Sequence, residues 1–296
     1  MNVKYKKNPI GITLVLLRTL FMIAMIAICT YPFLYVLNCS LSDSNYLVGN
    51  RGAMLLPKGF STQAYSAVFN NPNIFSGFKV TLFVLIVGTL LNVLMTAIGA
   101  FLVSRKNFAL AKPMMKMMLI TMYFGGGMIP TYLVVSQTLG LRDSVWSMIL
   151  PSLISVYNLI VMKTSFLAIP DSLEESAKLD GASDILILFK IIIPLSLPTV
   201  AVMFLFYGVG HWNAWFSALL YIDTREKFPL QMILREILLL NGTQSMMEGA
   251  QRADSVNIAE SIRYATIIVV TAPILVVYPF IQKYFVSGMM IGAVKG

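Results

Sequence analysis

The sequence predicts an all-α, polytopic membrane protein with six transmembrane helices and both termini in the cytoplasm. Three observations lead to this fold class. Only 12% of the 296 residues are charged and 57% are hydrophobic, whereas about 25% of the residues of a soluble domain are charged. The mean hydropathy is +0.78. Six apolar stretches reach the roughly 20 residues that a helix needs to cross a bilayer, so a water-soluble globule is excluded.

The six apolar stretches are the predicted spans. The first follows a basic segment with Lys4, Lys6 and Lys7, as a signal peptide does. Its apolar run is too long for a signal peptide and no cleavage site of small residues follows, so it reads as a retained anchor. The predicted spans are residues 12–38, 76–103, 114–137, 145–165, 196–221 and 264–286.

The placement of basic residues predicts the orientation. With the N-terminus inside, the cytoplasmic segments carry 13 of the 22 Lys and Arg residues and 5 of the 13 acids. The net charge is then +8 inside and +1 outside, which accounts for the total of +9. Retention of Lys and Arg on the cytoplasmic side explains this asymmetry, so the positive charge does not indicate nucleic-acid binding.

Three segments make up the predicted chain. Residues 1–75 are the N-terminal anchor helix and the first external loop, residues 76–287 the transmembrane core, and residues 288–296 a cytoplasmic tail. The second external loop opens with the amphipathic stretch Pro229–Leu240, which is too short and too charged to span. We expect that stretch to form a helix at the membrane interface or folded over the bundle.

The residue types present argue against a disulfide, a metal site, a membrane-embedded enzyme and an ion-coupled transporter. Cys29 and Cys39 lie on one predicted helix, roughly 15 Å apart, which is too far for a disulfide. With one histidine and no cysteine pair, the sequence predicts no metal site and no catalytic residues. A membrane-embedded enzyme or an ion-coupled secondary transporter would need ionisable residues inside the spans, and apart from Arg18 near a margin the predicted spans have essentially none.

The cytoplasmic loop 166–195 holds the most acidic stretch of the chain, and its start predicts a short helix. Ser172 and Glu175 are spaced for a capping box at the helix N-terminus. Glu174 and Lys178 are spaced i, i+4 and can form a surface ion pair.

The end of this helix is predicted as well. Gly181 stands where a left-handed residue ends a helix. A second helical run, residues 184–193, leads to Pro194 at the entrance of the fifth span. The loop therefore predicts a rigid knob on the cytoplasmic face. Its apolar contact points are Leu173, Ala177 and Leu179.

The same residues closely resemble a family motif. Glu175, Gly181 and Ile191 have the spacing of the EAA motif of binding-protein-dependent importers: Glu-Ala-Ala, three residues, Gly, nine residues, then Ile-x-Leu-Pro. Ser176 replaces the first Ala, and Ile193 replaces the Leu before the Pro. The chain thus resembles the permease subunits of type I ABC importers of the carbohydrate class.

This resemblance implies a coupling function for the loop, which in that family docks in a cleft of the ATPase subunit. The implied coupling residues are Glu175, Ser176, Ala177, Asp180, Gly181, Ala182, Ile191 and Pro194. The sequence contains no Gly-x-x-x-x-Gly-Lys-Ser/Thr motif, so we expect ATP and Mg to be used by a partner and this chain to bind no cofactor. The implied partners are a second permease, two ATPase subunits and an extracytoplasmic sugar-binding protein, assembled in the bacterial plasma membrane.

Other segments resemble the subfamily that handles polysaccharide-derived oligosaccharides. They are Phe124–Thr131, Trp212–Phe216 and the C-terminal segment Gln282–Gly296. Aromatic faces stack on sugar rings and an amide bonds hydroxyls, so some residues near these segments are candidates for the substrate pathway; the alternative is an anchoring role at the headgroups. The candidates are Tyr123, Trp212, Asn213 and Trp215.

Some readings of the sequence remain open. The run Gly125–Gly127 suits either close helix packing or a local break. His211 is expected to be a packed or hydrogen-bonded residue rather than a proton relay. An importer for another solute, such as a phosphorylated polyol or an amino acid, is the alternative within the same class.

Overall fold

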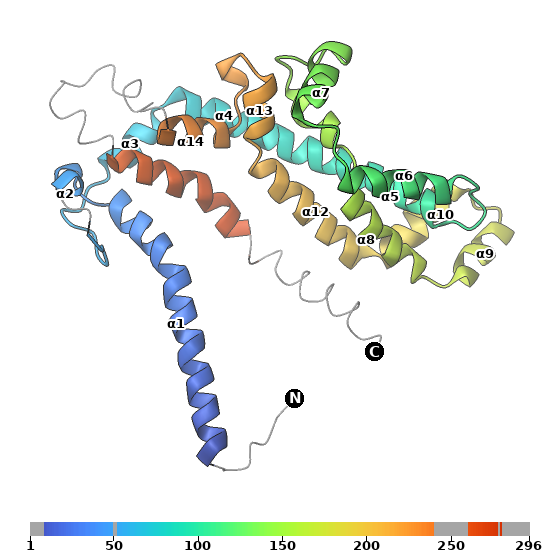
Figure 1. The fold of residues 1–296 in the computed structure, drawn as a ribbon, viewed down its shortest axis with the longest axis horizontal. Helices are drawn as coiled ribbons and strands as arrows, with labels where there is room; N and C mark the ends of the chain where they lie inside the picture. The colour runs from blue at the N-terminus through green and yellow to red at the C-terminus, as the bar shows by residue number, and fades with distance from the viewer. Residues whose placement is uncertain (1–8, 50–51, 240–259, 278, 280–296) are drawn as a thin grey trace. The chain divides into compact units, whose positions relative to one another are not determined.

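The computed structural model describes residues 9–49, 52–239, 260–277 and 279. All regular structure in these residues is helical, as the sequence predicts (Figure 1). The chain divides into two compact units, which are described separately. Unit 1 comprises residues 1–71 and 237–271, and unit 2 comprises residues 72–236 and 272–296.

The described helices reproduce the predicted spans. Three single helices are long and apolar enough to cross a membrane: Gly11–Ser40, Pro72–Ser104 and Glu260–Val277. Three further spans are pairs of helices with a bend between them, which gives six spans when each pair counts as one. The pairs are Ala111–Tyr123 with Met128–Thr138 (115°), Val145–Ser152 with Val156–Leu167 (50°), and Asp184–Leu195 with Leu197–Trp212 (88°). Most of the predicted end of the sixth span and the whole tail 288–296 lie outside the described residues.

Unit 1 is built on α1 (Pro9–Ser40) and on an ordered external loop with α2 (Ser44–Gly49) and α3 (Gln63–Phe69). Cys39 is buried in a small cluster with Leu47 and Met54. The ring of Tyr35 meets Tyr264 edge to face at 6.1 Å. Nearly all large apolar side chains of α1 from Ile12 to Leu34 are exposed, as in a helix that faces lipid or another subunit.

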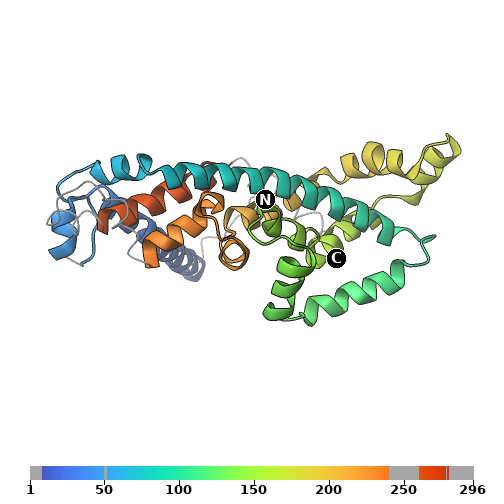
Figure 2. The same ribbon diagram turned by 90° about the horizontal axis from the view of Figure 1, so that it is seen from above.

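Unit 2 is built around one long helix and two neighbours. The long helix consists of α4 (Pro72–Phe83), the π-helical turn η1 (Val84–Gly88) and α5 (Thr89–Ser104). α8 (Val156–Leu167) and α12 (Leu197–Trp212) pack against α5, and the three lie together in both views (Figures 1 and 2). A Cβ at Gly99 of α5 would lie 3.0 Å from Leu159 of α8, so small residues allow this close packing.

The remaining elements of unit 2 are short and connect or cover this core. They are α6 (Ala111–Tyr123), α7 (Met128–Leu133), η2 (Val134–Thr138), η3 (Val145–Met148), η4 (Leu150–Ser152), α9 (Asp171–Leu179), α10 (Asp184–Ile187), η5 (Leu188–Ile192), α11 (Ile193–Leu195), α13 (Phe216–Tyr221), η6 (Arg225–Lys227) and α14 (Leu230–Leu239). The last of them, α14, has its final three residues in unit 1.

Two predictions about the spans are refined. Gly125 and Gly126 have no atom within 4 Å of an added Cβ, so the glycine run makes a break between α6 and α7 and not a packing contact. The predicted fifth span 196–221 is too long, because α12 ends at Trp212. There the side-chain amide of Asn213 donates to the Val209 carbonyl at 2.9 Å, and the chain turns into α13.

The predicted amphipathic helix is present as α14. Leu230 and Ile233 are buried, and the Leu230 N–H donates to Thr81 Oγ1 of α4 at 2.8 Å. A Cβ at Gly77 would lie 2.4 Å from Ile233 Cδ1. This end of α14 therefore folds over α4, one of the two placements that the sequence allows.

Candidate functional site

The predicted knob in the loop 166–195 begins with α9. Its N-cap residue is Pro170, which makes no side-chain cap hydrogen bond. The predicted capping box is therefore wrong: the helix begins before Ser172, because Leu173 N–H already bonds the Pro170 carbonyl at 3.2 Å. Asp171 and Glu174 lie in the first turn, where negative charge favours the helix dipole.

The predicted glycine stop is confirmed at the end of α9. Gly181 has φ +83°. Its N–H bonds the Lys178 carbonyl at 3.0 Å, and Ala182 N–H bonds the Ala177 carbonyl at 2.9 Å. This pair of bonds is a Schellman motif. Ser183 then caps α10 through a bond from Leu186 N–H at 3.3 Å, so the turn between the two helices is fixed on both sides.

Charges join α9 to the basic loop, which we define as residues 105–110 after α5. Glu174 is only 8% exposed and pairs with Arg105 as well as with Lys178 at 2.9 Å, the predicted i, i+4 pair. Lys106 Nζ lies 2.7 Å from Asp171 Oδ2. The hydrogen bond from Lys106 lowers the pKa of Asp171 below its ordinary value.

The outer surface of the knob combines acidic and apolar groups. Leu179 is 90% exposed and Leu173 is 44% exposed. Among the predicted coupling residues, Glu175, Ser176, Asp180, Gly181 and Pro194 are exposed. Ala177, Ala182 and Ile191 are half-buried and pack against the core of unit 2. The surface that a partner can reach therefore centres on Glu175, Asp180 and Leu179.

The knob is continuous with a cavity-lining helix. After α10, η5 and α11, the chain bends by 88° into α12. Ile187, Leu188 and Ile192 are buried in the core of unit 2, so the segment between the knob and the bend is anchored. The knob is therefore joined to α12 through a segment that packs in the core of unit 2.

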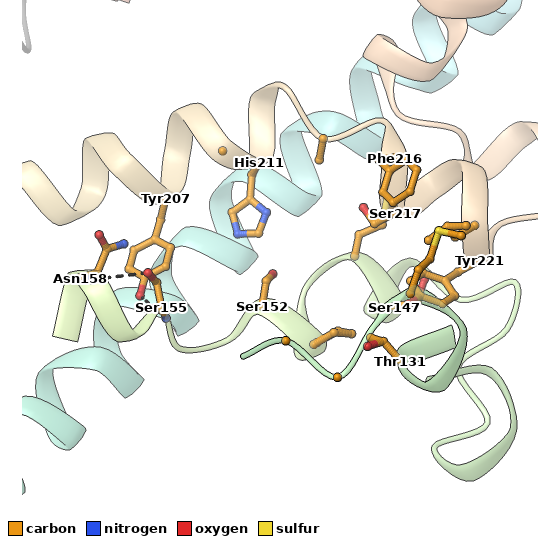
Figure 3. A pocket seen from close by; sticks show the side chains of 18 of the residues that line it. Thr131, Ser147, Ser152, Ser155, Asn158, Tyr207, His211, Phe216, Ser217 and Tyr221 are labelled. Atoms are coloured by element: carbon orange, nitrogen blue, oxygen red, sulfur yellow. Dashed lines mark hydrogen bonds between the residues drawn. The ribbon is translucent and has the colours of Figure 1, made fainter. Parts of the chain in front are cut away.

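Unit 2 contains a cavity of about 720 Å³ among α7, η3, η4, α8, α12 and α13 (Figure 3). Its lining includes the three glycines of the break at Gly125–Gly127. Among the described residues that line this cavity, none is Lys, Arg, Asp or Glu. The polar side chains in its wall are Thr131, Ser147, Ser152, Ser155, Asn158, Tyr207, His211, Ser217 and Tyr221.

The cavity wall is held where the fourth span breaks. Asn92 of α5 donates to the carbonyls of Ser152 at 2.7 Å and Leu153 at 2.9 Å. Tyr207 Oη accepts from Ser155 N–H at 3.0 Å and lies 2.6 Å from Thr96 Oγ1 of α5. A break inside a membrane needs such partners, because lipid cannot satisfy free backbone groups.

His211 is the hydrogen-bonded packing residue that the sequence predicts. It is 6% exposed, and its Nε2 lies 2.6 Å from Asn92 Oδ1. Asn92 orients its amide nitrogen to two carbonyls, so Oδ1 is left to accept and His211 Nε2 to donate. A Cβ at Gly88 would lie 2.6 Å from that nitrogen, so only glycine leaves room for the ring.

The four predicted pathway residues lie beside this cavity's wall and are not part of the lining. Tyr123 is exposed at the end of α6. Trp212 is buried against Phe78. Asn213 forms the bond that ends α12, and Trp215 lies under the Arg235 guanidinium at 5.0 Å. Their role in substrate passage stays a prediction.

Sequence reasoning missed the residues that support the wall. Asn92, Thr96 and Tyr207 are polar groups on apolar spans. The available signal was that a buried polar side chain in a membrane helix needs a partner.

Asp143 and its hydrogen-bond partners form a polar cluster at the connection between the third and fourth spans. Asp143 has φ +52° and accepts from Thr224 Oγ1 at 2.6 Å and from Lys227 Nζ at 2.6 Å. These bonds, with the Lys227 bond the largest cause, hold the pKa of Asp143 well below its usual range. The bonds of Asp143 to Thr224 and Lys227 fix the chain directly after α13. The last residue of α13, Tyr221, stacks on Tyr132 at 5.8 Å.

Comparisons with known proteins agree with this architecture. Residues 95–291 match the family described as binding-protein-dependent transport system inner membrane component. The chain is 40% identical over 276 residues to the polygalacturonan/rhamnogalacturonan transport system permease protein YtcP of Bacillus subtilis, covering 93% of this chain and 96% of that protein. It is 41% identical over 277 residues to protein LplC of the same organism, covering 94% and 93% of the two chains.

A solved structure is similar over nearly the whole chain. It is described as the crystal structure of a bacterial ABC transporter involved in the import of the acidic polysaccharide alginate. The TM-score is 0.83 at 26% identity, with 96% of this chain and 100% of the other covered. This chain therefore belongs to the inner membrane components of binding-protein-dependent transport systems: it is the permease subunit of an ABC importer, and a separate subunit hydrolyses ATP.

Proposed function

We propose that this permease forms half of the translocation pathway of a carbohydrate importer, with oligosaccharides as its substrate class. The names of several relatives support this class. YtcP is named for polygalacturonan and rhamnogalacturonan, GanQ of Bacillus subtilis, 28% identical, for galactooligosaccharides, and the similar structure for alginate import.

The observation that carries the proposal is the cavity, whose described lining is mostly apolar but includes several uncharged polar side chains. Hydroxyl and amide groups in its wall can exchange hydrogen bonds with sugar hydroxyls as these leave water. Its volume of about 720 Å³ lies in the usual range of small-molecule sites. The charged groups of an acidic sugar, a phosphorylated polyol or an amino acid find no Lys, Arg, Asp or Glu in the described lining, so they would need partners outside it. The part of the cavity that this chain supplies therefore suits hydroxyl-rich, uncharged portions of a substrate.

The knob supplies the coupling to ATP hydrolysis. The exposed carboxylates of Glu175 and Asp180 and the exposed side chain of Leu179 suit a cleft with basic and apolar groups on an ATPase subunit. The full assembly that we propose contains a second permease, two ATPase subunits and an extracytoplasmic sugar-binding protein. When the ATPases close, they draw the two knobs together, and the bundle opens outward to receive sugar.

Two substitutions in the knob test this coupling. Glu175→Lys reverses a charge on the exposed face, and Gly181→Asp places a side chain at φ +83°, which L residues rarely adopt. We expect both variants to insert normally, to lose co-purification with the ATPase and to lose uptake. Glu226→Lys is the matched control, because it makes the same charge change in η6 on the predicted external side.

The two measurements are co-purification of the ATPase with the tagged permease and uptake of labelled oligosaccharide into cells. The control variant should match the parent chain in both. If both knob variants keep the ATPase and normal uptake, the knob is not the docking surface.

A further inference from the structure

We infer that Arg105 is a positioning residue that ties the docking helix α9 to α5 and so to the wall of the cavity. This inference rests on the proposed docking function of the knob. It adds a second connection between the knob and the cavity, beside the covalent one through α10, η5, α11 and α12.

Arg105 is placed for this role at the end of α5. It is the C-cap residue of that helix, and its guanidinium carbon lies 4.5 Å above the centre of the Phe101 ring. Phe101 is 5% exposed and belongs to the core of unit 2. The guanidinium is thus held on a rigid surface while it reaches across to Glu174 of α9.

The partner carboxylate is also held. Glu174 is 8% exposed, whereas Glu175, Asp171 and Asp180 on the same helix are exposed. A buried carboxylate needs a paired cation, and removal of one partner leaves the other charge uncompensated. The contact is therefore expected to persist whenever α9 moves, unlike a contact between solvated side chains.

The contact engages only part of the guanidinium. Arg105 Nη1 meets Glu174 Oε2, while Nε and Nη2 are buried and have no hydrogen-bond partner among the described residues. A pair joined through one nitrogen can pivot, whereas a bidentate pair fixes the orientation of both groups. Glu174 is thus the described partner of the guanidinium, and the pair links α9 to α5.

The same helix α5 carries the residues that hold the cavity wall. Asn92 and Thr96 lie about 20 Å and about 14 Å along the helix from Arg105. Asn92 supports the broken fourth span and His211, and Thr96 contacts Tyr207. No break interrupts α5 between Thr89 and Ser104. A pull on Arg105 therefore reaches two wall contacts through one continuous helix.

A second ion pair joins the same two segments and provides an internal control. Lys106 and Asp171 are 81% and 64% exposed in their side chains, so water and salt screen their attraction. Loss of the Lys106 charge should therefore leave coupling unchanged, although it breaks a contact between the basic loop and α9.

The experiment uses the complete complex of this permease with its partner permease, ATPase and binding protein, reconstituted in liposomes. The variants are Arg105→Gln, Glu174→Gln, the double variant, Arg105→Lys and the control Lys106→Gln. Three quantities are measured: co-purification of the ATPase, ATP hydrolysis with the binding protein present, and sugar transported per ATP hydrolysed.

We expect Arg105→Gln to keep the ATPase bound and to lower sugar transported per ATP at least fivefold. Arg105→Lys should recover at least half of that loss, because it keeps the cation. The double variant should be no worse than the poorer single variant, since both remove one interaction. Lys106→Gln should remain within twofold of the parent.

Four results would overturn the inference. Sugar transported per ATP could be the same for Arg105→Gln as for the Lys106→Gln control, or as low for Arg105→Lys as for Arg105→Gln. The losses could add in the double variant, or Arg105→Gln could fail to assemble with the ATPase. Glu175→Lys in the same assay separates this inference from the proposed docking. If Glu175→Lys loses the ATPase while the Arg105 variants match the control, docking stands and the Arg105 role fails. If Glu175→Lys keeps both the ATPase and uptake, docking fails and the inference fails with it.

Discussion

Asn92 joins three parts of the cavity wall through a single amide. It donates to two carbonyls at the break of the fourth span and accepts from His211. The side chain is fully buried. Such hydrogen bonds inside a membrane protein average about 0.6 kcal/mol each, while a buried carbonyl left unpaired costs about 1–3 kcal/mol. Asn92 thus stabilises the break of the fourth span inside the membrane, where no water can bond the free carbonyls.

Asn92→Leu keeps the size of the side chain and removes all three bonds. We expect the free energy of unfolding to fall by about 2 kcal/mol, seen as a lower melting temperature of the purified permease in detergent. Asn213→Ala is the control, because its amide makes one bond to a carbonyl of its own helix. Equal melting temperatures for the two variants would contradict the role given to Asn92.

The sequence predicts contacts between residues a few positions apart on one helix, but it does not predict contacts between residues far apart in the chain. Gly181 and the Glu174–Lys178 pair follow from distances of a few residues along one helix, which the sequence states directly. Asn92 and His211 are 119 residues apart, and their contact exists only once α5 and α12 have packed. The complementary charges of the basic loop and the acidic stretch indicate that the two segments attract each other, but they do not indicate which basic residue pairs with which acid.

Three of the six spans are bent pairs of helices, and each break has its own chemistry. A run of glycines separates α6 from α7, and the bend before α12 lies beside Pro194 and Pro198. At the fourth span, Asn92 and Tyr207 satisfy the exposed backbone. Hydropathy predicts the number of spans, because it averages apolar character over a window, but that average contains no information on direction. The glycine run left one break open as an alternative, and the other two bends were not predicted.

The glycines of the first break should differ in their tolerance of a side chain. Gly127 has φ +86° and ψ 160°, a region essentially restricted to glycine, so Gly127→Ala should destabilise the protein by about 1–3 kcal/mol. Gly125→Ala should have little effect, because its φ is not positive and an added Cβ meets no atom within 4 Å. Melting temperatures of the two variants in detergent provide the comparison, and equal losses would contradict the assigned backbone strain.

At the scale of the whole molecule, the permease joins the knob, which we propose as the ATPase docking surface, to a cavity without charged residues in its described lining. Composition and the EAA spacing were sufficient to predict the membrane fold, the family and the knob. They did not locate the cavity, because its wall combines residues from six separate helical elements with a glycine run. The predicted aromatic candidates lie next to the cavity, since sequence analogy identifies a segment but not which of its side chains faces inward.

The most direct test of carbohydrate import is the substrate dependence of ATP hydrolysis by the reconstituted complex. Binding protein loaded with an oligosaccharide should stimulate hydrolysis and drive uptake of that sugar, whereas an amino acid or a phosphorylated polyol should do neither. Stimulated hydrolysis and uptake with an amino acid or a phosphorylated polyol, and none with any oligosaccharide, would contradict the account.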